Sequence, residues 1–519
     1  MRKKLENHRE SNSSLWTRHM FRLYAILSLG YLCIVLQGYD GALMTSINAM
    51  PQYQEYFHIT SASSITGLIF AIYNIGSLGA LPFAGPINDI SGRRSGIFLG
   101  CCFIIIGTCV QAPAASRHVF LGGRFLCGFG QGFINVSAPV FVSELAHPRW
   151  RGPLSGLMQT NYYVGSIIAS WVTYGTAFFD GESAFRIPIW LQLVISGIIA
   201  MGIWFSPETP RWLMAHGRRE EAEKVLASLI LKTGFDKRWW DYSDLFNTRS
   251  ARRRMICVIG MAWFGQYSGN ALVSYYFPVI VQQAGIENAH TQLLLNALNP
   301  IVSWIMAIIG AMLLDRGGRR PFLLSGVLGM SICLAIVTGC TKLSVEMSNR
   351  SASHAGIFFI YLFSAIFAFC VVPLLPFYIA ETLATETRAK GTAVGQVFGS
   401  AASILGQYTT AAAIASIGYY YYLVFIFWDI LEWIIIYFFF VETKRRTLEE
   451  MVEIFEAPDP AAQEIGSAKI ESTREDIINA DLSHLEDNMH ITGILRLIAQ
   501  WPDVVATAFK NHEPSTITT

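Results

Sequence analysis

Two charged motifs occur in both halves of the chain, once in each half. One is an aspartate followed four and five residues later by two arginines, and the other is a glutamate followed seven residues later by an arginine. Carboxylates and guanidiniums form charge-assisted, often bidentate pairs. The repeats predict an internal duplication and two clusters of ion pairs, formed by Asp89, Arg93, Arg94, Glu144 and Arg151, and by Asp315, Arg319, Arg320, Glu381 and Arg388.

Asp40 and Arg124 are charged residues inside long apolar stretches. A carboxylate at bilayer depth is costly unless it is paired or protonated. Beside a guanidinium it stays ionised, and separation of the pair favours uptake of a proton. The two residues could therefore load and release a proton. A static ion pair that only fixes helix packing is the alternative.

Composition narrows the classes of protein that could position these charges. Of the 519 residues, 52% are hydrophobic and 14% are charged, whereas soluble proteins carry about 25% charged residues. An ordinary soluble enzyme and a disordered chain are both excluded. A net charge of +1 gives no field that attracts nucleic acid. The histidines, cysteines and carboxylates show no metal-ligand or catalytic spacing, so we expect no metal and no cofactor.

Twelve apolar stretches are long enough for helices that cross a bilayer, which takes about 20 residues. They predict an all-α membrane protein built as two six-helix repeats around a central cavity, the architecture of rocking transporters. The stretches are approximately residues 21–48, 64–83, 95–111, 119–142, 154–178, 187–205, 255–282, 293–314, 322–341, 356–380, 392–417 and 420–441.

The expected domains follow from these stretches. They are an N-terminal segment 1–20, a first bundle 21–205, a linker 206–254 with short helices, a second bundle 255–441 and a tail 442–519.

Lysine and arginine lie at the N-terminus and in alternate loops, including those of Arg93, Arg151, Arg319 and Arg388. Positive charge is retained on the cytoplasmic side, so both termini and the linker are predicted to be cytoplasmic. There the repeated charges would hold an inner gate shut while the cavity opens outward. Asn349 begins an Asn-Arg-Ser sequon in a predicted outer loop, which predicts glycosylation.

The depths of Asp40 and Arg124 can be estimated from the rise of a helix. Counting from Arg22 places Asp40 roughly 27 Å up the first span, in its outer half. Arg124 follows His118 by six residues, which places it about 9 Å below the outer end of the fourth span. Similar depth predicts that the two side chains meet.

An ordered set of motifs runs from about Gly38 to Glu450. It consists of Asp89 to Arg94, Gly123-Arg124, Pro139 through Glu144 to Arg151-Gly152, Pro207 to Arg211, Gln266 to Gly269 through Tyr275-Tyr276, Asp315 to Arg320, and Glu442 to Lys444 with Arg446 to Glu450. In this set the chain resembles the sugar porter family of the major facilitator superfamily. The 378–391 stretch and Trp428-Asp429 look most like its fungal lactose permease and hexose transporter-like branch.

The resemblance implies the major facilitator fold and sugar transport by alternating access. It adds Glu208, Arg211 and Glu442 to the expected inner-gate network. Proton-linked members of the family have aspartate at the place of Asp40, whereas facilitative animal glucose carriers have asparagine, which favours proton coupling.

The resemblance also indicates substrate-binding residues. Gln159 and Gln266 match sugar-binding glutamines of the family, and amide and hydroxyl groups restore the hydrogen bonds that a sugar loses to water. Buried amides in membrane helices also serve as links between helices, and that alternative stays open. Further candidates are Asn270, Tyr275, Tyr276 and Asn299, with Asn161 and Gln407 as secondary ones.

Several positions depart from the family pattern. Ile90 stands where an arginine of the first gate motif is usual, and Gly265 replaces the first glutamine of the seventh-span pair. Ser303 takes the place of an asparagine, and Pro376 takes the place of the tryptophan that stacks on the sugar in glucose carriers. Glucose specificity therefore cannot be carried over.

These observations predict a plasma-membrane symporter that imports a mono- or disaccharide with a proton. Its partners would be the sugar, the proton and membrane lipid, with a monomer as the functional unit. A facilitative uniporter, a nutrient-sensing receptor and a carrier of a non-sugar metabolite on the same fold are the alternatives.

Overall fold

The computed structural model describes residues 18–60, 63–145, 151–209, 212–213, 245–283, 286, 288–347, 349–383, 387–444, 451 and 454–455. Every regular element in this part of the chain is a helix. Arg211, the predicted N-terminal segment as far as residue 17, most of the predicted linker and the tail beyond residue 455 lie outside the described residues.

The first half contains seven α-helices and one 3-10 turn within the described residues. They are α2 (Arg18–Asn48), α3 (Pro51–Phe57), α4 (Ser64–Ser91), α5 (Arg93–Gln111), α6 (Arg117–Leu145), α7 (Arg151–Thr176), α8 (Ser183–Gly202) and η1 (Ile203–Phe205). All except the short α3 correspond to the six apolar stretches predicted for this half.

The second half follows the same plan with two of its spans divided. Its elements are α11 (Arg249–Tyr267), α12 (Asn270–Gln283), α13 (Ala289–Gly317), α14 (Arg319–Met347), α15 (Arg350–Cys370), α16 (Leu374–Thr382), α17 (Arg388–Ile417), η3 (Gly418–Tyr420) and α18 (Tyr421–Phe439).

The seventh and tenth predicted spans are broken rather than continuous. Between α11 and α12, Gly269 has a φ of +78°, which an L-residue with a side chain rarely adopts. Tyr276 within α12 also departs from helical geometry, with φ −113° and ψ 17°. Between α15 and α16 the chain turns at Val371 to Pro373, where the proline lacks an N–H for a helical hydrogen bond and disfavours helical geometry at Val372.

Length and apolarity identify nine membrane-crossing segments among the described helices, and one of these, Lys390–Phe439, contains both α17 and α18. The protein is therefore a multi-pass membrane protein. The α7 helix and the broken pair α11 and α12 fall outside this set. Polar residues explain this for α7, which carries Gln159, Thr160 and Asn161 in succession.

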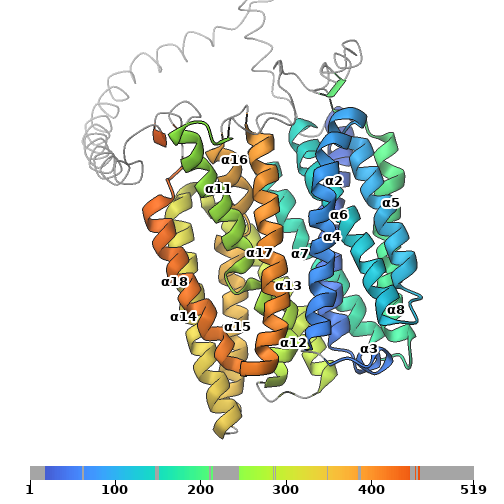
Figure 1. Cartoon of the computed structure of the whole chain (residues 1–519), viewed down its shortest axis with the longest axis vertical. Coiled ribbons are helices and arrows are strands. Elements are labelled where there is room, and N and C mark those ends of the chain that lie inside the picture. The colour runs from blue at the N-terminus through green and yellow to red at the C-terminus, as the bar shows by residue number, and fades with distance from the viewer. Residues whose placement is uncertain are drawn as a thin grey trace, which may run out of the picture. The chain divides into compact units, whose positions relative to one another are not determined.

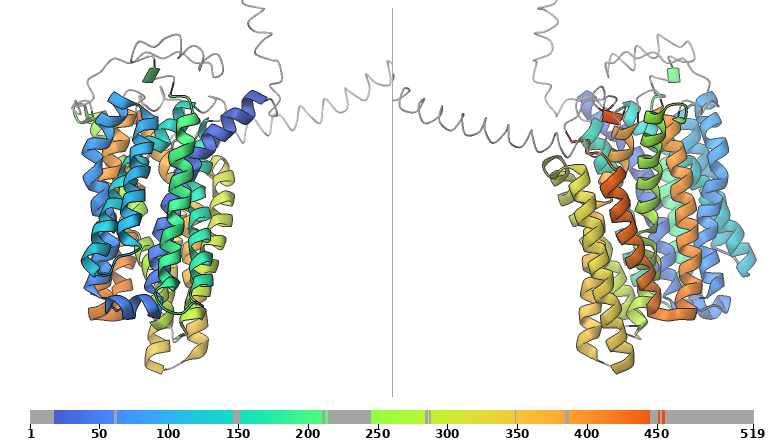
Figure 2. Two further views of the ribbon diagram at one scale, coloured as in Figure 1. Left: turned by 90° about the vertical axis from the view of Figure 1, so that its right-hand side faces the viewer. Right: turned by 60° about the vertical axis from the view of Figure 1, so that its left-hand side comes forward.

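The long helices of each half form a bundle, and the two bundles stand side by side with their helices roughly parallel (Figure 1). The junction is formed by α2, α4 and α7 of the first half and by α12, α13 and α17 of the second. We call the end of the bundle where α5 and α14 begin the arginine end, and the opposite end the far end. At the far end α14 and α15 extend beyond the other helices (Figure 2).

Glycines allow two pairs of helices in the first half to approach very closely. A Cβ atom at Gly38 of α2 would lie 1.8 Å from the carbonyl oxygen of Tyr162 in α7. A Cβ atom at Gly128 of α6 would lie 1.9 Å from the carbonyl oxygen of Tyr73 in α4. Neither position leaves room for a side chain, so these contacts fix where α2 and α6 place their charged residues.

Candidate functional site

Asp40 of α2 and Arg124 of α6 form an ion pair inside the first half. Nη1 of Arg124 lies 2.5 Å from Oδ1 of Asp40, and each side chain is 2% exposed. The guanidinium also lies over the ring of Tyr73, 4.7 Å from its centroid. The two side chains thus meet, as their similar depth predicts.

The surroundings of this pair leave part of its hydrogen-bonding capacity unused. Within the described residues, Oδ2 of Asp40 and Nε of Arg124 have no hydrogen-bond partner. Separating a buried ion pair leaves two uncompensated charges, and removal of one partner typically costs about 3–5 kcal/mol. Protonation of Asp40 would remove one of these charges, so separation of the pair and binding of a proton are physically linked.

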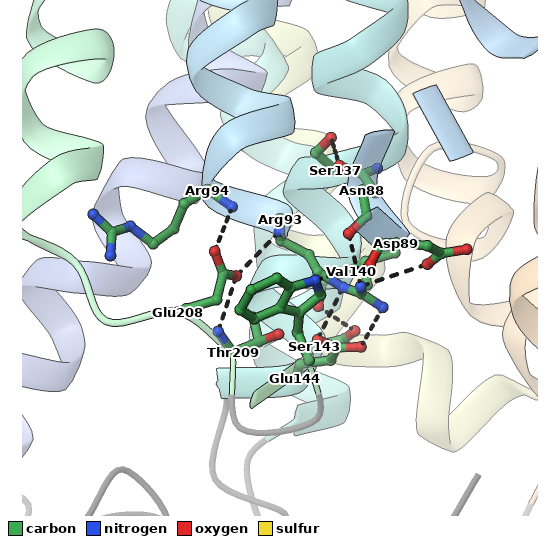
Figure 3. Close-up of polar contacts among 11 residues, drawn as sticks. Asn88, Asp89, Arg93, Arg94, Ser137, Val140, Ser143, Glu144, Glu208 and Thr209 are labelled. Atoms are coloured by element: carbon green, nitrogen blue, oxygen red, sulfur yellow. Dashed lines mark hydrogen bonds and ion pairs between the residues drawn. The ribbon is translucent and has the colours of Figure 1, made fainter. Parts of the chain in front are cut away.

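At the arginine end of the first half, Arg93 at the start of α5 pairs with Glu144 at the end of α6 (Figure 3). Nε of Arg93 lies 3.3 Å from Oε2 of Glu144, and Nη2 donates to Oε1 at 3.3 Å. Asp89 is a weaker partner, because its Oδ1 lies 3.6 Å from Nη1 of Arg93 and its side chain is 47% exposed. The Arg94 side chain extends to η1 and donates to the carbonyl oxygens of Ile203 and Trp204 at 3.2 and 2.7 Å.

Glu208 caps the first turn of α5. Its carboxylate accepts from the backbone N–H groups of Arg93 and Arg94 at 3.1 and 3.4 Å, where a helix start favours negative charge. Burial raises the pKa of the Glu208 carboxyl above its usual value, although these N–H donors and that of Thr209 oppose the shift. Gly92 makes room for the cap, since a Cβ atom there would lie 2.4 Å from Oε2 of Glu208.

The second half repeats this arrangement. Nη2 and Nε of Arg319 donate to the Glu381 carboxylate at 3.0 and 3.2 Å. Glu442 accepts from the backbone N–H groups of Arg319 and Arg320 at 2.8 and 2.9 Å, as Glu208 does on α5. Arg320 reaches α18 as Arg94 reaches η1, donating to the carbonyl oxygen of Tyr437 and lying over its ring.

The contacts described for these predicted gate residues lie within one half at a time. They join α5, α6 and the segment after η1 in the first half, and α14, α16 and the segment after α18 in the second. In this conformation they fasten the arginine end of each half. A gate between the halves stays a prediction, because the side chains of Arg151, Asp315 and Arg388, like the whole of Arg211, lie outside the described part.

The two halves meet instead through neutral contacts near the far end. Nδ2 of Asn296 in α13 donates to Oγ of Ser46 in α2 at 2.9 Å. The hydroxyl group of Thr45 donates to the carbonyl oxygen of Ser274 in α12 at 3.1 Å. The rings of Phe70 in α4 and Tyr275 in α12 are 5.3 Å apart.

Nearer the middle, an amide link crosses the same junction. Nδ2 of Asn74 in α4 donates to Oε1 of Gln407 in α17 at 2.8 Å. The hydroxyl group of Tyr276 donates to the Gln407 carbonyl oxygen at 3.0 Å. The structure therefore brings Tyr276 and the secondary candidate Gln407 together at one point of the junction, and the ring of Phe70 contacts both Tyr275 and Tyr276.

The other predicted substrate residues are more scattered. Gln159 on α7 and Gln266 at the end of α11 are both half-buried. Asn270 accepts from the hydroxyl group of Ser274 at 2.9 Å, one turn along its own helix. Asn299 on α13 is half-buried, and its Oδ1 has no hydrogen-bond partner among the described residues. Asn161 donates to Leu157 of its own helix at 2.8 Å, as a helix-internal contact.

The departures at Gly265 and Pro376 are linked in space. A Cβ atom at Gly265 would lie 2.1 Å from Cδ1 of Leu375, the residue before Pro376 on α16. An apolar side chain thus occupies the space into which a glutamine at position 265 would extend. Ser303, which takes the place of an asparagine, is buried.

Sequence reasoning missed three amides in the first half. Asn74 makes the link to Gln407 described above, and Gln131 on α6 donates from Nε2 to Oδ1 of Asn135 at 2.8 Å. Gln131 is buried, and its Oε1 lacks a partner among the described residues. Helical spacing could have found the α6 pair, because Gln131 and Asn135 follow Arg124 by seven and eleven residues and so share its face.

Asn349 is exposed and caps the start of α15. Its Oδ1 accepts from the backbone N–H groups of Ser351 and Ala352 at 3.0 and 3.4 Å. Glycosylation at this residue stays a prediction.

The arrangement of the helices is the fold of solved major facilitator superfamily proteins. Structural similarity agrees: the xylose transporter XylE from E. coli, in a partially occluded inward-open conformation, has a TM-score of 0.69 and 20% sequence identity. That match covers 82% of this chain and 99% of XylE. A further structure of the XylE proton:xylose symporter, bound to 6-bromo-6-deoxy-D-glucose, has a TM-score of 0.68 over 84% of this chain.

Sequence comparison gives the family. The profile described as "Sugar (and other) transporter" matches residues 27–455, and the chain belongs to this family. The high-affinity glucose transporter of Kluyveromyces lactis is 27% identical over 480 residues, covering 85% of this chain and 87% of the relative. The quinate permease of Neurospora terricola is 27% identical over 482 residues, covering 84% and 89%. The protein is thus a transporter and not an enzyme.

Proposed function

We propose that this protein is a proton-coupled symporter that imports a sugar across the plasma membrane by alternating access. The buried Asp40–Arg124 ion pair carries the proposal, with its 2.5 Å contact and almost no exposure. An ionisable pair in a membrane-spanning bundle is expensive to keep, and it is retained where it serves transport.

In the proposed cycle, the arginine end is cytoplasmic and the far end faces outward. The neutral contacts between Ser46 and Asn296 and between Thr45 and Ser274 close the outer side in this conformation. Rocking of the two halves would break them and move α2 relative to its neighbours. A proton on Asp40 would lower the cost of separating it from Arg124, so proton binding and rocking become coupled.

The substrate would lie between the halves, to which both bundles contribute amide side chains. Gln159 of the first half and Gln266, Asn270 and Asn299 of the second offer donors and acceptors for sugar hydroxyl groups. Oδ1 of Asn299 supports this proposal, because it is buried without a partner among the described residues and could accept from a ligand.

The test is uptake of labelled glucose, xylose, lactose and cellobiose in transporter-null yeast, with external pH recorded. We expect concentrative uptake with alkalinisation of the medium, and loss of both in Asp40→Asn. Asp180→Asn is the matched control, because Asp180 is an exposed carboxylate in the loop before α8. It should behave as the wild type does.

Two results would overturn the proposal. Concentrative uptake that persists in Asp40→Asn would show that this carboxylate does not couple the proton. Downhill uptake without alkalinisation in the wild type would identify a uniporter.

A carrier of a polyhydroxylated acid is the second candidate function. Gly265 beside Leu375 departs from the sugar-binding pattern of the family, and relatives named as quinate permeases are as similar as the named glucose transporter. Competition for uptake between glucose and quinate separates the two functions. Uptake of quinate that glucose does not inhibit would favour the acid carrier.

A further inference from the structure

Two carboxylates lie together in the middle of the last span. Asp429 and Glu432 are three residues apart on α18, so they share one face, and each is 0% exposed. Asp429 follows Tyr421 by eight residues and Glu432 precedes Phe439 by seven. These separations place both carboxylates at least about 10 Å from either end of the helix.

Their oxygen atoms are largely without partners. The indole N–H of Trp428 donates to Oε1 of Glu432. Both oxygens of Asp429 and Oε2 of Glu432 have no hydrogen-bond partner within the described residues. A buried ionised carboxylate needs a cation or several donors to offset its lost hydration.

The elements packed against α18 bring little charge to this point. On α11, Tyr267 contacts the ring of Trp428, and Cys257 donates to the Phe439 carbonyl oxygen. On α14, Cys333 is buried, and Arg320 lies over Tyr437 and donates to its carbonyl oxygen. Tyr437 is eight residues beyond Asp429 and five beyond Glu432, or about 12 Å and about 8 Å along the helix. On α17, Thr410 offers only a neutral hydroxyl group, which donates to Tyr421, and the η3 tyrosines precede α18 at the far end.

An unused donor lies on the facing helix. Gly260 and Tyr267 of α11 both face α18, since a Cβ atom at Gly260 would lie 3.2 Å from the Phe440 ring and Tyr267 packs on Trp428. Trp263 falls between them on the same face of α11. Its Nε1 is buried and has no hydrogen-bond partner within the described residues. The contact between Tyr267 and Trp428 aligns α11 with α18. Trp263 lies four residues from Tyr267, and Glu432 lies four residues from Trp428 in the same direction across the membrane. Trp263 and Glu432 are therefore at about the same height along the two helices.

Two ionised carboxylates cannot be held side by side here without a cation, because their repulsion adds to the cost of burial. Binding of one proton removes the repulsion between the carboxylates and the burial cost of one of the two charges. The indole donors favour a carboxylate and oppose a metal ion, which would need more oxygen ligands than one helix offers here. A proton is therefore the ligand that this chemistry fits.

We propose that Asp429 and Glu432 form a second proton-binding site, in which one proton is shared by the two carboxyl groups and the remaining negative charge is held by the indole N–H group of Trp428. This site is separate from Asp40 and Arg124, which lie in the first half. It goes beyond the proposed coupling role of that pair and does not depend on which substrate is carried.

Infrared spectroscopy of the purified full-length protein tests this site without any transport measurement. We expect a band from a protonated carboxyl group at neutral pH, which decreases by about one group per chain in Asp429→Asn or Glu432→Gln. Glu346→Gln is the control, because Glu346 is exposed near the end of α14 and should leave the band unchanged. The two carboxamide variants serve as independent probes if one of them folds poorly.

Three results would overturn the proposal. They are absence of a protonated-carboxyl band in the wild type at neutral pH, a band that neither variant changes, and a band that appears only when sodium or potassium ions are removed. The last result would identify a monovalent cation as the ligand. Failure of the Asp40→Asn uptake test would leave this readout unaffected, so the two proposals can fail separately.

Discussion

The two halves of the molecule are alike at the arginine end and different in their interiors. Arg93 with Glu144 and Arg319 with Glu381 are equivalent ion pairs, and Glu208 and Glu442 cap equivalent helices. The first half encloses the Asp40–Arg124 pair, whereas the second encloses Asp429 and Glu432 without a described cation. Duplication has thus retained the contacts that hold each bundle together and changed the groups that a ligand or a proton could meet.

This comparison also shows where the molecule can move. The described contacts between the halves near the far end are neutral hydrogen bonds and ring contacts, each of which contributes about 1 kcal/mol. The ion pairs at the arginine end lie within a half. The proposed rocking of the bundles would therefore break only the weaker contacts and leave the ion pairs within each half intact.

The largest effect is expected from removal of an arginine in the two equivalent ion pairs. Arg93→Gln leaves Glu144, whose side chain is 4% exposed, without its cation, and should destabilise the protein by about 3 kcal/mol. Arg319→Gln leaves Glu381 30% exposed and still bonded to the Thr443 hydroxyl group, so about 1 kcal/mol is expected. Thermal unfolding in detergent measures both.

A double variant controls for loss of charge in general. Arg93→Gln with Glu144→Gln should recover most of the stability lost in the single variant, because no charge is left unpaired. Equal losses in Arg93→Gln and Arg319→Gln would show that burial of the partner does not decide the cost.

The next effect concerns the glycines that precede α5 and α14. Gly92 and Gly318 have φ of +93° and +86° with extended ψ, a region that is essentially restricted to glycine. Alanine at either position should cost about 1–3 kcal/mol, and more at Gly92, where the added Cβ atom lies closer to the capping carboxylate.

Gly197→Ala on α8 is the control for these glycines, because a Cβ atom there meets no atom within 4 Å. It should leave the unfolding temperature unchanged or slightly raised. A loss as large as that of Gly92→Ala would contradict the conformational argument.

A smaller effect is expected at the junction between the halves. Ser46→Ala removes the hydroxyl group that accepts from Asn296 and should weaken the closed far end by about 1 kcal/mol, or about fivefold in the conformational equilibrium. The distribution of distances between spin labels at the far ends of α2 and α13 should then shift toward the longer distances of the open conformation. Ser416→Ala, on an exposed serine that bonds only within its own helix, should not shift them.

The smallest effect is a pH dependence at Glu208. Burial raises its pKa, so the folded chain holds this proton more tightly than the unfolded chain does. The resulting stability is full below the unfolded pKa and is lost as pH rises through the folded pKa. Glu208→Gln should therefore flatten the decline of the unfolding temperature over that range. An unchanged slope would show that another group titrates there.

Much of the architecture could be read from local patterns. Apolar length determines which segments span a membrane, and all twelve stretches correspond to described helices or helix pairs. The meeting of Asp40 and Arg124 was predictable because the rise of a helix converts residue number into depth. The substrate residues Gln159 and Gln266 lie on the expected spans, and their roles remain predictions.

Other features depend on packing between residues far apart in the chain. The filling of the Gly265 space by Leu375 and the link between Asn74 and Gln407 required knowledge of which helix faces meet. The break in the tenth span escaped the hydropathy pattern, since apolar residues continue from Val371 to Leu374. The break in the seventh span lies among the polar residues from Gln266 to Asn270, but a hydropathy window that averages over the whole span does not show it.

By itself, the sequence determined the number, order and apolar character of the spans. It also determined the duplicated charge motifs and the positions of the buried charges along their helices. These properties depend on neighbouring residues and on the fixed geometry of the helix. Tertiary structure decided that the arginine pairs fasten each half internally, and that Asp429 and Glu432 are enclosed without a described cation. The physical reason is that a helix pattern specifies which side chains share a face, whereas the partner of that face is selected by the packing of the whole bundle.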